Sequence, residues 1–142
     1  MEQRRSIHQV HIGRDFSLRP IMRVLRRNDC IGLLGDQDAG RDGLFVRFFD
    51  RPASTPRGAA TIALKQGIPI VCVFPTRQPD HTHVLELERV DFDPALSGEA
   101  AVADFTQKIT ARLEAAIRRR PELYLWAHKR WKSSPPGAGA SA

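Results

Sequence analysis

Apolar and polar positions recur along the chain with two different periods, and these periods predict where helices and strands lie. Helices are expected over residues 17–28, 58–66, 97–119 and 122–132, and strands over residues 30–34, 44–49, 68–74 and 83–90. In the 97–119 segment, apolar residues recur every three or four positions, as they do on the buried face of a helix. The order helix, strand, strand, helix, strand, strand, helix, helix is typical of an α/β domain.

Two of the predicted strands indicate how the sheet is built. Residues 68–74 are nearly all apolar and rich in β-branched side chains, which is typical of a parallel strand buried on both faces. Pro75 is expected to end this strand. Residues 83–90 alternate between apolar and polar, which predicts an edge or half-exposed strand. The sequence therefore predicts an α/β fold with a mixed, largely parallel sheet flanked by helices.

Length and composition predict one domain with flanking segments. The chain has 142 residues, of which 42% are hydrophobic, so it is expected to be globular. Residues 1–16 are interpreted as a basic N-terminal segment, residues 17–132 as the folded part, and residues 133–142 as a disordered tail. No apolar run reaches transmembrane length and no signal peptide opens the chain, so any membrane contact is expected to be peripheral.

The charge balance narrows the kind of partner. Lysine and arginine outnumber aspartate and glutamate by 22 to 16, and the formal charge of +6 favours a phospholipid surface or nucleic acid. The first predicted helix carries a basic stripe of four residues, Arg19, Arg23, Arg26 and Arg27. This stripe suits anionic headgroups or a nucleic-acid backbone, and a solvated outer face explains it equally well. Trp126 and Trp131 stand among cations, which suits a membrane interface, stacked bases or a face that packs against the body.

Residues 51–58 are interpreted as the approach to a helix. Ser54 or Thr55 is expected to cap it, with Arg57 in its first turn and Arg51 nearby. A helix start offers free backbone N–H groups and a positive dipole end, so a phosphate, a carboxylate or the oxyanion of an acyl transfer suits this place. An ordinary capped helix whose arginines face water is the alternative.

The acidic loop after residue 35 and the two cysteines raise the question of a metal. The pair Asp36 and Asp38 fails as a calcium loop, because Arg47 stands where a bidentate glutamate belongs. Asp36 is instead expected to orient an arginine or to accept a substrate hydroxyl. Cys30 and Cys72 lie in apolar runs and are expected to be buried free thiols. No metal and no cofactor are expected.

Histidines that could act as a general base are few. His11 and Asp15 are four residues apart, so a helix would place them on one face as an acid–base pair; a surface segment with a capping aspartate is the alternative. Two other histidines are each followed by a glutamate five positions later, namely His81 by Glu86 and His83 by Glu88. On an extended strand such residues point to opposite faces, so neither pair is expected to cooperate.

Several segments taken together resemble one known family. These are Gly32-Leu-Leu-Gly-Asp-Gln-Asp, Gly43-Leu-Phe-Val-Arg-Phe-Phe, Arg51-Pro-Ala-Ser-Thr-Pro-Arg-Gly, Pro69-Ile-Val-Cys-Val-Phe and the ending over residues 119–132. They resemble the lipid A late acyltransferases, the lauroyl/myristoyl enzymes of the lysophospholipid acyltransferase superfamily, over residues 18–132. Phosphatidylinositol-mannoside acyltransferases share much of this layout. The pair Asp36-Gln37 and the ending over residues 126–132 favour the lipid A enzymes.

The resemblance implies a reaction and its partners. It implies a glycerolipid-acyltransferase-like fold that transfers a fatty acyl chain from acyl carrier protein or acyl-CoA to the hydroxyl of a glycolipid acceptor. It also implies a cytoplasmic protein that is peripheral on the inner face of the cytoplasmic membrane and contacts that anionic surface. A basic, non-catalytic module that binds anionic lipid or nucleic acid is the alternative function.

The same resemblance implies that the chain is incomplete as an enzyme. In that family a histidine acts as general base and an acidic residue five positions later orients it. Here His8 is followed at that distance by Gly13, and His11 by Phe16. The chain is therefore expected to be the C-terminal half of such an enzyme, inactive or dependent on a missing N-terminal half. A half-domain with an uncovered sheet edge is also expected to self-associate.

The resemblance and the local chemistry together give a set of candidate site residues. For catalysis the set holds none beyond the weak candidates His11 and Asp15. The candidates for substrate binding are Asp36, Gln37, Arg41, Arg47, Phe49, Ser54, Thr55, Arg57 and Gly58.

Overall fold

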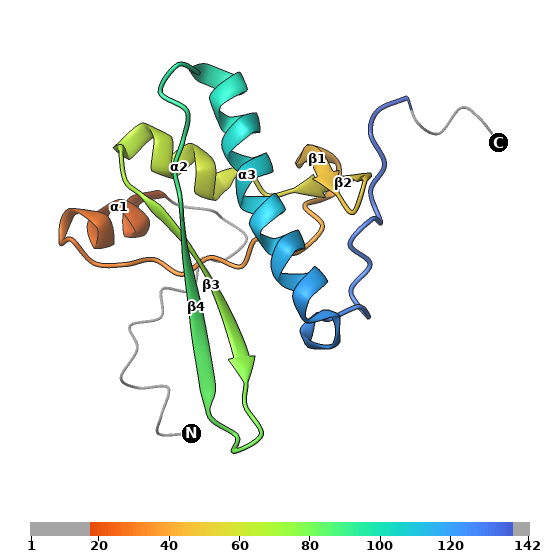
Figure 1. The fold of residues 1–142 in the computed structure, drawn as a ribbon. Coiled ribbons are helices and arrows are strands. Elements are labelled where there is room, and N and C mark those ends of the chain that lie inside the picture. Colours follow the sequence, from red (N-terminus) through yellow and green to blue (C-terminus); the bar gives the residue numbers. More distant parts are fainter. Residues whose placement is uncertain (1–17, 138–142) are drawn as a thin grey trace. The chain divides into compact units, whose positions relative to one another are not determined.

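The computed structural model describes residues 18–137 and divides the chain into two compact units, with the boundary between Leu33 and Leu34 (Figure 1). The described part of the first unit contains helix α1, Leu18–Arg26, as the apolar spacing predicts. Asn28 has a φ of 60° and turns the chain, and the Asp29 N–H donates to the Val24 carbonyl oxygen at 3.3 Å.

The strand predicted over residues 30–34 does not form. These residues have no regular secondary structure and pair with no other strand in the described part of the chain. Leu34 is 84% exposed, and Cys30 is exposed rather than buried as expected. A short apolar run becomes a strand only where a neighbouring strand takes its backbone hydrogen bonds, so the prediction for this segment is wrong.

The second unit begins with a tight hairpin. Strand β1, Leu44–Phe48, pairs antiparallel with β2, Arg51–Thr55, so that Phe48 lies opposite Arg51. A short 3-10 turn, Gly40–Asp42, precedes it. The two residues of the hairpin loop, Phe49 and Asp50, have φ values of 49° and 59°. Positive φ at both positions is the geometry of a type I′ turn, which matches the twist of an antiparallel pair.

A second hairpin replaces the expected parallel sheet. Helix α2, Gly58–Gln66, leads through the left-handed Gly67 into β3, Ile70–Arg77, which pairs antiparallel with β4, His83–Val90. The described residues thus contain two separate two-stranded antiparallel sheets, and the expectation of a largely parallel sheet is wrong. The half-exposed β4 strand and the Gly67 cap were predicted correctly.

The β3 strand is not buried on both faces, although its sequence is almost continuously apolar. Val71 and Val73 are each 49% exposed, while the alternate residues Ile70, Cys72 and Phe74 are half-buried. Pro75 lies inside β3 and does not end it. Proline is tolerated there because β3 has a partner on one side only, so its missing N–H need not serve a second strand.

Helix α3, Gly98–Arg119, joins the elements of the second unit. Figure 1 shows it running past both hairpins, and it contacts α2, β1, β3 and β4. One buried cluster lies between α2, β4 and α3 and consists of Ala60, Ala63, Val90, Val102 and Phe105. A second cluster of Phe48, Ala53 and Ile117 lies where the C-terminal half of α3 meets the first hairpin. These two clusters position the elements of the second unit that carry the site described below.

The last predicted helix, over residues 122–132, is replaced by a short 3-10 helix, Pro121–Leu123, followed by turns. The reason is packing, since the Trp131 ring stacks on Phe48 with the ring centroids 5.5 Å apart. Tyr124 also packs edge-on to Phe48 at 6.3 Å. Of the three interpretations of the tryptophans, packing against the body holds for Trp131, while Trp126 is 51% exposed.

The outer face of the second hairpin is apolar and uncovered in the part of the chain that the structure describes. Val73 pairs with Leu87 on this face, and Leu87 is 66% exposed. Leu85 on the same face is 58% exposed. The opposite face packs against α3, where Glu88 lies 3.4 Å from the Arg112 Nε. None of the described helices is both long and apolar enough to cross a membrane.

Candidate functional site

A buried arginine joins the first hairpin to the C-terminal segment. Arg130 is 1% exposed, and its Nη1 donates to the Ser54 carbonyl oxygen at 2.6 Å. Its Nη2 donates to the Thr55 Oγ1 at 2.6 Å, and its guanidinium carbon lies 5.3 Å from the centroid of the Phe48 ring. Burial lowers the pKa of Arg130, but guanidinium stays protonated in proteins. A buried positive charge therefore lies between the end of β2 and the C-terminal segment.

Asp38 ties the loop before the first hairpin to the same C-terminal segment. Its carboxylate accepts hydrogen bonds from the Gly40 N–H at 3.0 Å, the Ser133 Oγ at 2.8 Å and the Ser133 N–H at 3.2 Å. Its own backbone N–H donates to the His128 Nε2 at 3.0 Å. Burial opposes ionisation of Asp38, but the bonds from Ser133 and Gly40 and the charge of Arg130 outweigh it, so the pKa of Asp38 is lowered.

Ser54 and Thr55 do not cap a helix as predicted. Both lie in β2 and are buried, and the Ser54 Oγ donates to the Gly40 carbonyl oxygen at 2.6 Å. The fit is close, since a Cβ placed on Gly43 would meet the Ser54 Oγ at 2.0 Å. The hydroxyl groups of these two residues therefore hold the loop and Arg130 in place.

The start of α2 does not gather the two arginines expected there. Arg57 is the residue before the helix, and its Nη2 donates to the Glu99 Oε1 at 2.6 Å. The guanidinium carbon of Arg51 instead lies 5.1 Å from the centroid of the Trp131 ring. Gly58 is the first residue of α2. Arg57 is thus already paired with an acidic side chain, and Arg51 lies beside Trp131 instead of at the start of α2. The structure therefore does not support the interpretation of this helix start as an anion site with two arginines.

Two further candidates lie at the other end of the hairpin. Arg47 is exposed, and its Nη2 donates to the Asp50 Oδ1 at 2.7 Å. Phe49 donates its N–H to the Glu114 Oε2 at 2.7 Å, and the Arg118 guanidinium lies 4.7 Å from the centroid of its ring. In the strand register Leu44 lies opposite Thr55, so the loop end that carries Phe49 is separated from Ser54 and Thr55 by the length of the hairpin.

The structure places one of the predicted residues, Arg41, at an open pocket of ≈ 510 Å³ in the second unit. The pocket is lined by Asp38, Gly40, Arg41, Lys132, Ser133 and Ser134. Asp36 is half-buried, and its charge acts on Arg130, while Gln37 is exposed. Asp36 was predicted to orient an arginine, but its side chain forms no hydrogen bond with an arginine of the described residues.

Sequence reasoning missed the C-terminal members of this group. Arg130 and Lys132 were noted only as cations beside tryptophans, and Ser133 was assigned to a disordered tail, whereas both Ser133 donors bind Asp38. The cationic run over residues 128–132 was the one signal in the sequence, but nothing in it distinguishes a buried arginine from an exposed one. His11 and Asp15 lie outside the described residues.

The two histidine–glutamate pairs do not form an acid–base dyad. His83 and Glu88 lie in β4 on opposite faces, as expected, with Glu88 beside the Arg112 Nε. The His81 Nδ1 lies 2.9 Å from the Arg77 Nη2, while Glu86 pairs with the Arg119 Nη2 at 2.8 Å. The prediction that neither pair cooperates is confirmed.

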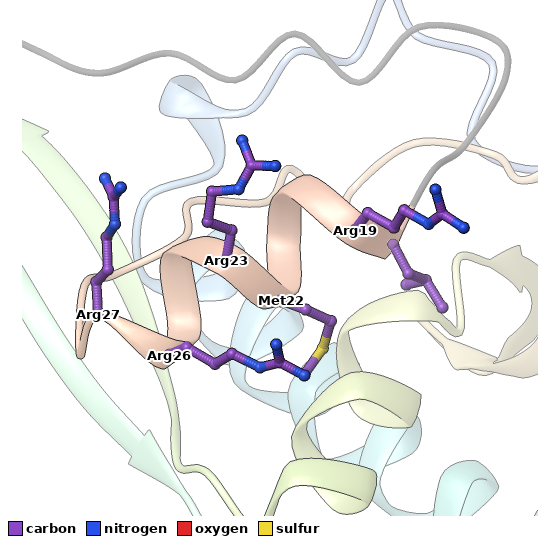
Figure 2. Close-up of a pocket in the computed structure, with 6 residues that line it drawn as sticks. Arg19, Met22, Arg23, Arg26 and Arg27 are labelled. Carbon is purple, nitrogen blue, oxygen red and sulfur yellow. The ribbon is translucent and has the colours of Figure 1, made fainter.

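A second basic surface lies on α1 in the first unit. Figure 2 shows the side chains of Arg19, Met22, Arg23, Arg26 and Arg27 extending from this one helix. They line a pocket of ≈ 500 Å³. The lining residues are Leu18, Arg19, Met22, Arg23, Arg26 and Arg27, which we call the α1 arginine surface. All four arginines are exposed, and none forms an ion pair with another of the residues that the structure describes.

The fold and these surfaces define a mixed α/β protein with two exposed, arginine-bearing pockets. Comparison with known proteins gives the family: the model of the bacterial lipid A biosynthesis acyltransferases matches residues 1–133, so the chain belongs to that family. The chain is 32% identical over 132 residues to the lipid A biosynthesis palmitoleoyltransferase of Escherichia coli, covering 89% of this chain and 40% of the relative. It is 28% identical over 123 residues to the lipid A biosynthesis lauroyltransferase of the same organism, covering 84% of this chain and 39% of that relative.

The family resemblance drawn from the sequence is therefore confirmed, and the match extends beyond the segments that suggested it. A Shigella flexneri lipid A biosynthesis acyltransferase is also 32% identical over 132 residues, with 89% of this chain and 40% of the relative covered. The chain thus spans about 40% of the length of the curated relatives it matches.

Proposed function

We propose that this chain takes part in lipid A-type acyl transfer, in which a fatty acyl chain passes from acyl carrier protein or CoA to a glycolipid hydroxyl. The observation that carries the proposal is the family match over residues 1–133. It is supported by relatives named for palmitoleoyl and lauroyl transfer in lipid A biosynthesis. Palmitoleoyl and lauroyl transfer are named for these longer relatives. The proposal extends acyl transfer from them to this chain.

The chain contributes substrate binding in this proposal, and the general base comes from elsewhere. His83 and Glu88 lie on opposite faces of β4, His81 lies beside Arg77 of β3, and the two glutamates pair with arginines of α3. A base must reach the proton it removes, with its orienting acid beside it. We therefore expect this chain to need a segment that carries a histidine and an acidic residue five positions later.

The candidate residues divide into two roles by their burial. Gln37, Arg41, Arg47 and the half-buried Asp36, Phe49, Arg57 and Gly58 are accessible and are proposed to contact substrate. Ser54 and Thr55 are buried, and they act on the site by holding the Asp38 loop and Arg130. They are positioning residues in this proposal.

The α1 arginine surface supports contact with the anionic inner face of the cytoplasmic membrane. Like charges at helical spacing repel one another by about 0.2–0.5 kcal/mol per pair, and an anionic surface relieves this repulsion. Each arginine near such a surface contributes about 1 kcal/mol of attraction. Leu18, which is 48% exposed, and Met22 lie beside the arginines and can enter the interfacial region.

The test of the proposed function is an acyl-transfer assay. The purified chain is given an acyl-carrier-protein thioester and a lipid A precursor, with and without a separately made segment of a relative that carries the histidine motif. We expect no transfer by the chain alone and transfer when the segment is added. Transfer by the chain alone would contradict the missing-base argument, and no transfer by the combination would contradict the acyltransferase proposal.

The alternative function, a basic module that binds nucleic acid, has one supporting observation, the α1 arginine surface itself. Duplex DNA binding that falls steeply with salt, without preference for anionic vesicles, would favour it. If binding to DNA and binding to anionic vesicles depend equally on salt, and the protein clearly prefers the vesicles, the membrane role is favoured.

A further inference from the structure

The segment that follows α3 leaves large apolar side chains exposed on the second unit. Trp126 is 51% exposed, and its neighbours Leu125 and Leu123 are 68% and 48% exposed. The Trp126 ring lies beside Phe49, with the centroids 5.9 Å apart, so the loop of the first hairpin continues the same surface. The Arg118 guanidinium carbon lies 4.7 Å from the centroid of the Phe49 ring. We call Phe49, Arg118, Leu123, Leu125 and Trp126 the Trp126 surface.

The exposed tryptophan is fixed in position, and its polar atom already has a partner. The Trp126 Nε1 donates to the Pro121 carbonyl oxygen at 2.7 Å, and the Trp126 backbone N–H donates to the Tyr124 carbonyl oxygen at 2.9 Å. An indole whose N–H is bonded within the protein can leave water without losing a hydrogen bond. A side chain that is ordered in advance also loses little conformational entropy on binding. The exposed part of the Trp126 ring is therefore suited to apolar contacts.

The surroundings of this surface are positively charged. Residues 118–132 contain six lysines and arginines and one acidic residue. Arg118 pairs with Glu114, but exposed Lys129 and exposed Arg51 form no ion pair within residues 18–137. Exposed apolar side chains among cations complement an anionic bilayer, whose headgroups attract the charges while its acyl chains accept the apolar groups.

We propose that the Trp126 surface inserts into the interfacial region of an anionic phospholipid bilayer, where Trp126 and Leu125 reach the acyl chains. Tryptophan is enriched at this level of membranes, and the strength of interfacial binding increases with the apolar area buried and with the charge attraction. The inference goes beyond the proposed function, in which membrane contact depends on the charges of the α1 arginine surface in the first unit. Here the second unit binds by apolar insertion.

Two other occupants fit the surface less well. In a symmetric contact with a second copy, the same cationic segment would face itself, and like charges across an interface oppose association. Single-stranded nucleic acid would stack on the Trp126 ring, but Leu125 is more exposed than Trp126 and offers neither a stacking face nor a hydrogen bond. A bilayer accepts both side chains.

The test uses the fluorescence of the full chain, whose two tryptophans are Trp126 and Trp131. Vesicles of phosphatidylcholine and phosphatidylglycerol are prepared with and without acyl chains brominated near the headgroup, because bromine quenches only those indoles that reach it. Trp126→Phe removes the exposed fluorophore and keeps an aromatic ring. It leaves Trp131, which stacks on Phe48 with the centroids 5.5 Å apart, as the reporter of a packed position.

We expect brominated vesicles to quench the parent chain and to leave Trp126→Phe unquenched. In sedimentation with vesicles, Leu125→Gln should weaken binding about tenfold, because it removes an apolar side chain that the bilayer would bury. The matched control is Leu34→Gln, since Leu34 is 84% exposed and lies outside the Trp126 surface. It should change binding less than about twofold. Thermal unfolding checks that both variants keep the fold.

Vesicle binding without quenching of the parent chain would overturn the proposal and would leave the α1 arginine surface as the membrane contact. Equal quenching of the parent chain and Trp126→Phe, or equal loss of binding in Leu125→Gln and Leu34→Gln, would overturn it as well. Two further results would overturn it in favour of another occupant. Stronger quenching of Trp126 by single-stranded DNA than by brominated vesicles assigns the surface to stacked bases, and a shift toward the monomer in Leu125→Gln without lipid assigns it to a second copy.

The result is independent of the acyl-transfer assay, because it is a binding measurement on the chain alone. Quenching of Trp126 by lipid in a chain that supports no acyl transfer would leave this inference standing and remove the proposed function. Acyl transfer without quenching of Trp126 would do the reverse.

Discussion

The Nη2 of Arg130 donates a hydrogen bond to the Thr55 Oγ1 at 2.6 Å, although 75 positions separate the two residues. The same guanidinium binds the Ser54 carbonyl oxygen, and Arg130 is 1% exposed. The C-terminal segment that follows the 3-10 helix Pro121–Leu123 is thus held to the first hairpin by a buried cation.

Replacing Arg130 with alanine should destabilise the protein by about 3 kcal/mol or more, since two buried acceptors lose a charged donor. Thr55→Val should cost about 1–3 kcal/mol, because it leaves the Nη2 without its partner. Urea unfolding measures both changes. Lys129→Ala is the control, and we expect a change within about 0.5 kcal/mol because Lys129 is exposed. A similar loss for Lys129→Ala would contradict the central place of Arg130.

Acid should loosen the bond between the Asp38 loop and Ser133. The pKa of Asp38 is below its ordinary value of 3.8, so Asp38 contributes stability that is fully present above that value. The contribution is lost as the pH falls through the lower pKa of the folded state. Unfolding free energies measured at decreasing pH should therefore fall less steeply below about pH 4 in Asp38→Asn than in the parent chain.

Ser133→Ala provides a second check on the same carboxylate. It removes the side-chain hydrogen bond that lowers the pKa of Asp38, so it should also flatten the acid limb, while it keeps the charge at Asp38. Identical acid limbs in all three proteins would show that other carboxylates dominate acid unfolding.

The α1 arginine surface should determine binding to anionic vesicles. Arg23→Gln combined with Arg27→Gln removes two cations, and at about 1 kcal/mol each it should weaken binding to phosphatidylglycerol vesicles about thirtyfold. Sedimentation with vesicles measures the partition. The control removes the same charge elsewhere, with Lys65→Gln and Arg120→Gln, both exposed. An equal loss in the control would mean that net charge, rather than this surface, attracts the protein.

The outer face of the β3–β4 hairpin should make the chain self-associate, as the sequence predicts for an uncovered apolar surface. Val73 and Leu87 lie opposite each other there, and the hairpin pairs with no other described strand. Replacing both with serine should shift the sedimentation coefficient toward that of a monomer. Val84→Ser, on the other face of the hairpin, is the comparison. A monomeric parent chain in analytical ultracentrifugation would rule the prediction out.

Local sequence patterns located several strands and helices, but they did not show which strands pair with one another. The β1 strand and Gly67 were predicted because alternation and a glycine cap are properties of a few adjacent residues. The β3 strand was also located, but its partner was not, since a continuous apolar run suits a parallel strand and an antiparallel edge equally. Residues 30–34 are also a short, mainly apolar run and form no strand.

The sequence by itself determined the helix over residues 98–119, the positions of strands β1, β3 and β4, and the family, because each depends on short-range spacing or on motifs read in order. It did not predict strand β2, which was interpreted as the approach to a helix. Only the tertiary structure decided that Arg130 is buried, that Ser54 and Thr55 serve it, and that Asp38 binds Ser133 and His128. The physical reason is that hydrogen-bond partners of buried polar groups are chosen by packing between distant segments. An arginine in a cationic run carries no local sign of which oxygen it will meet.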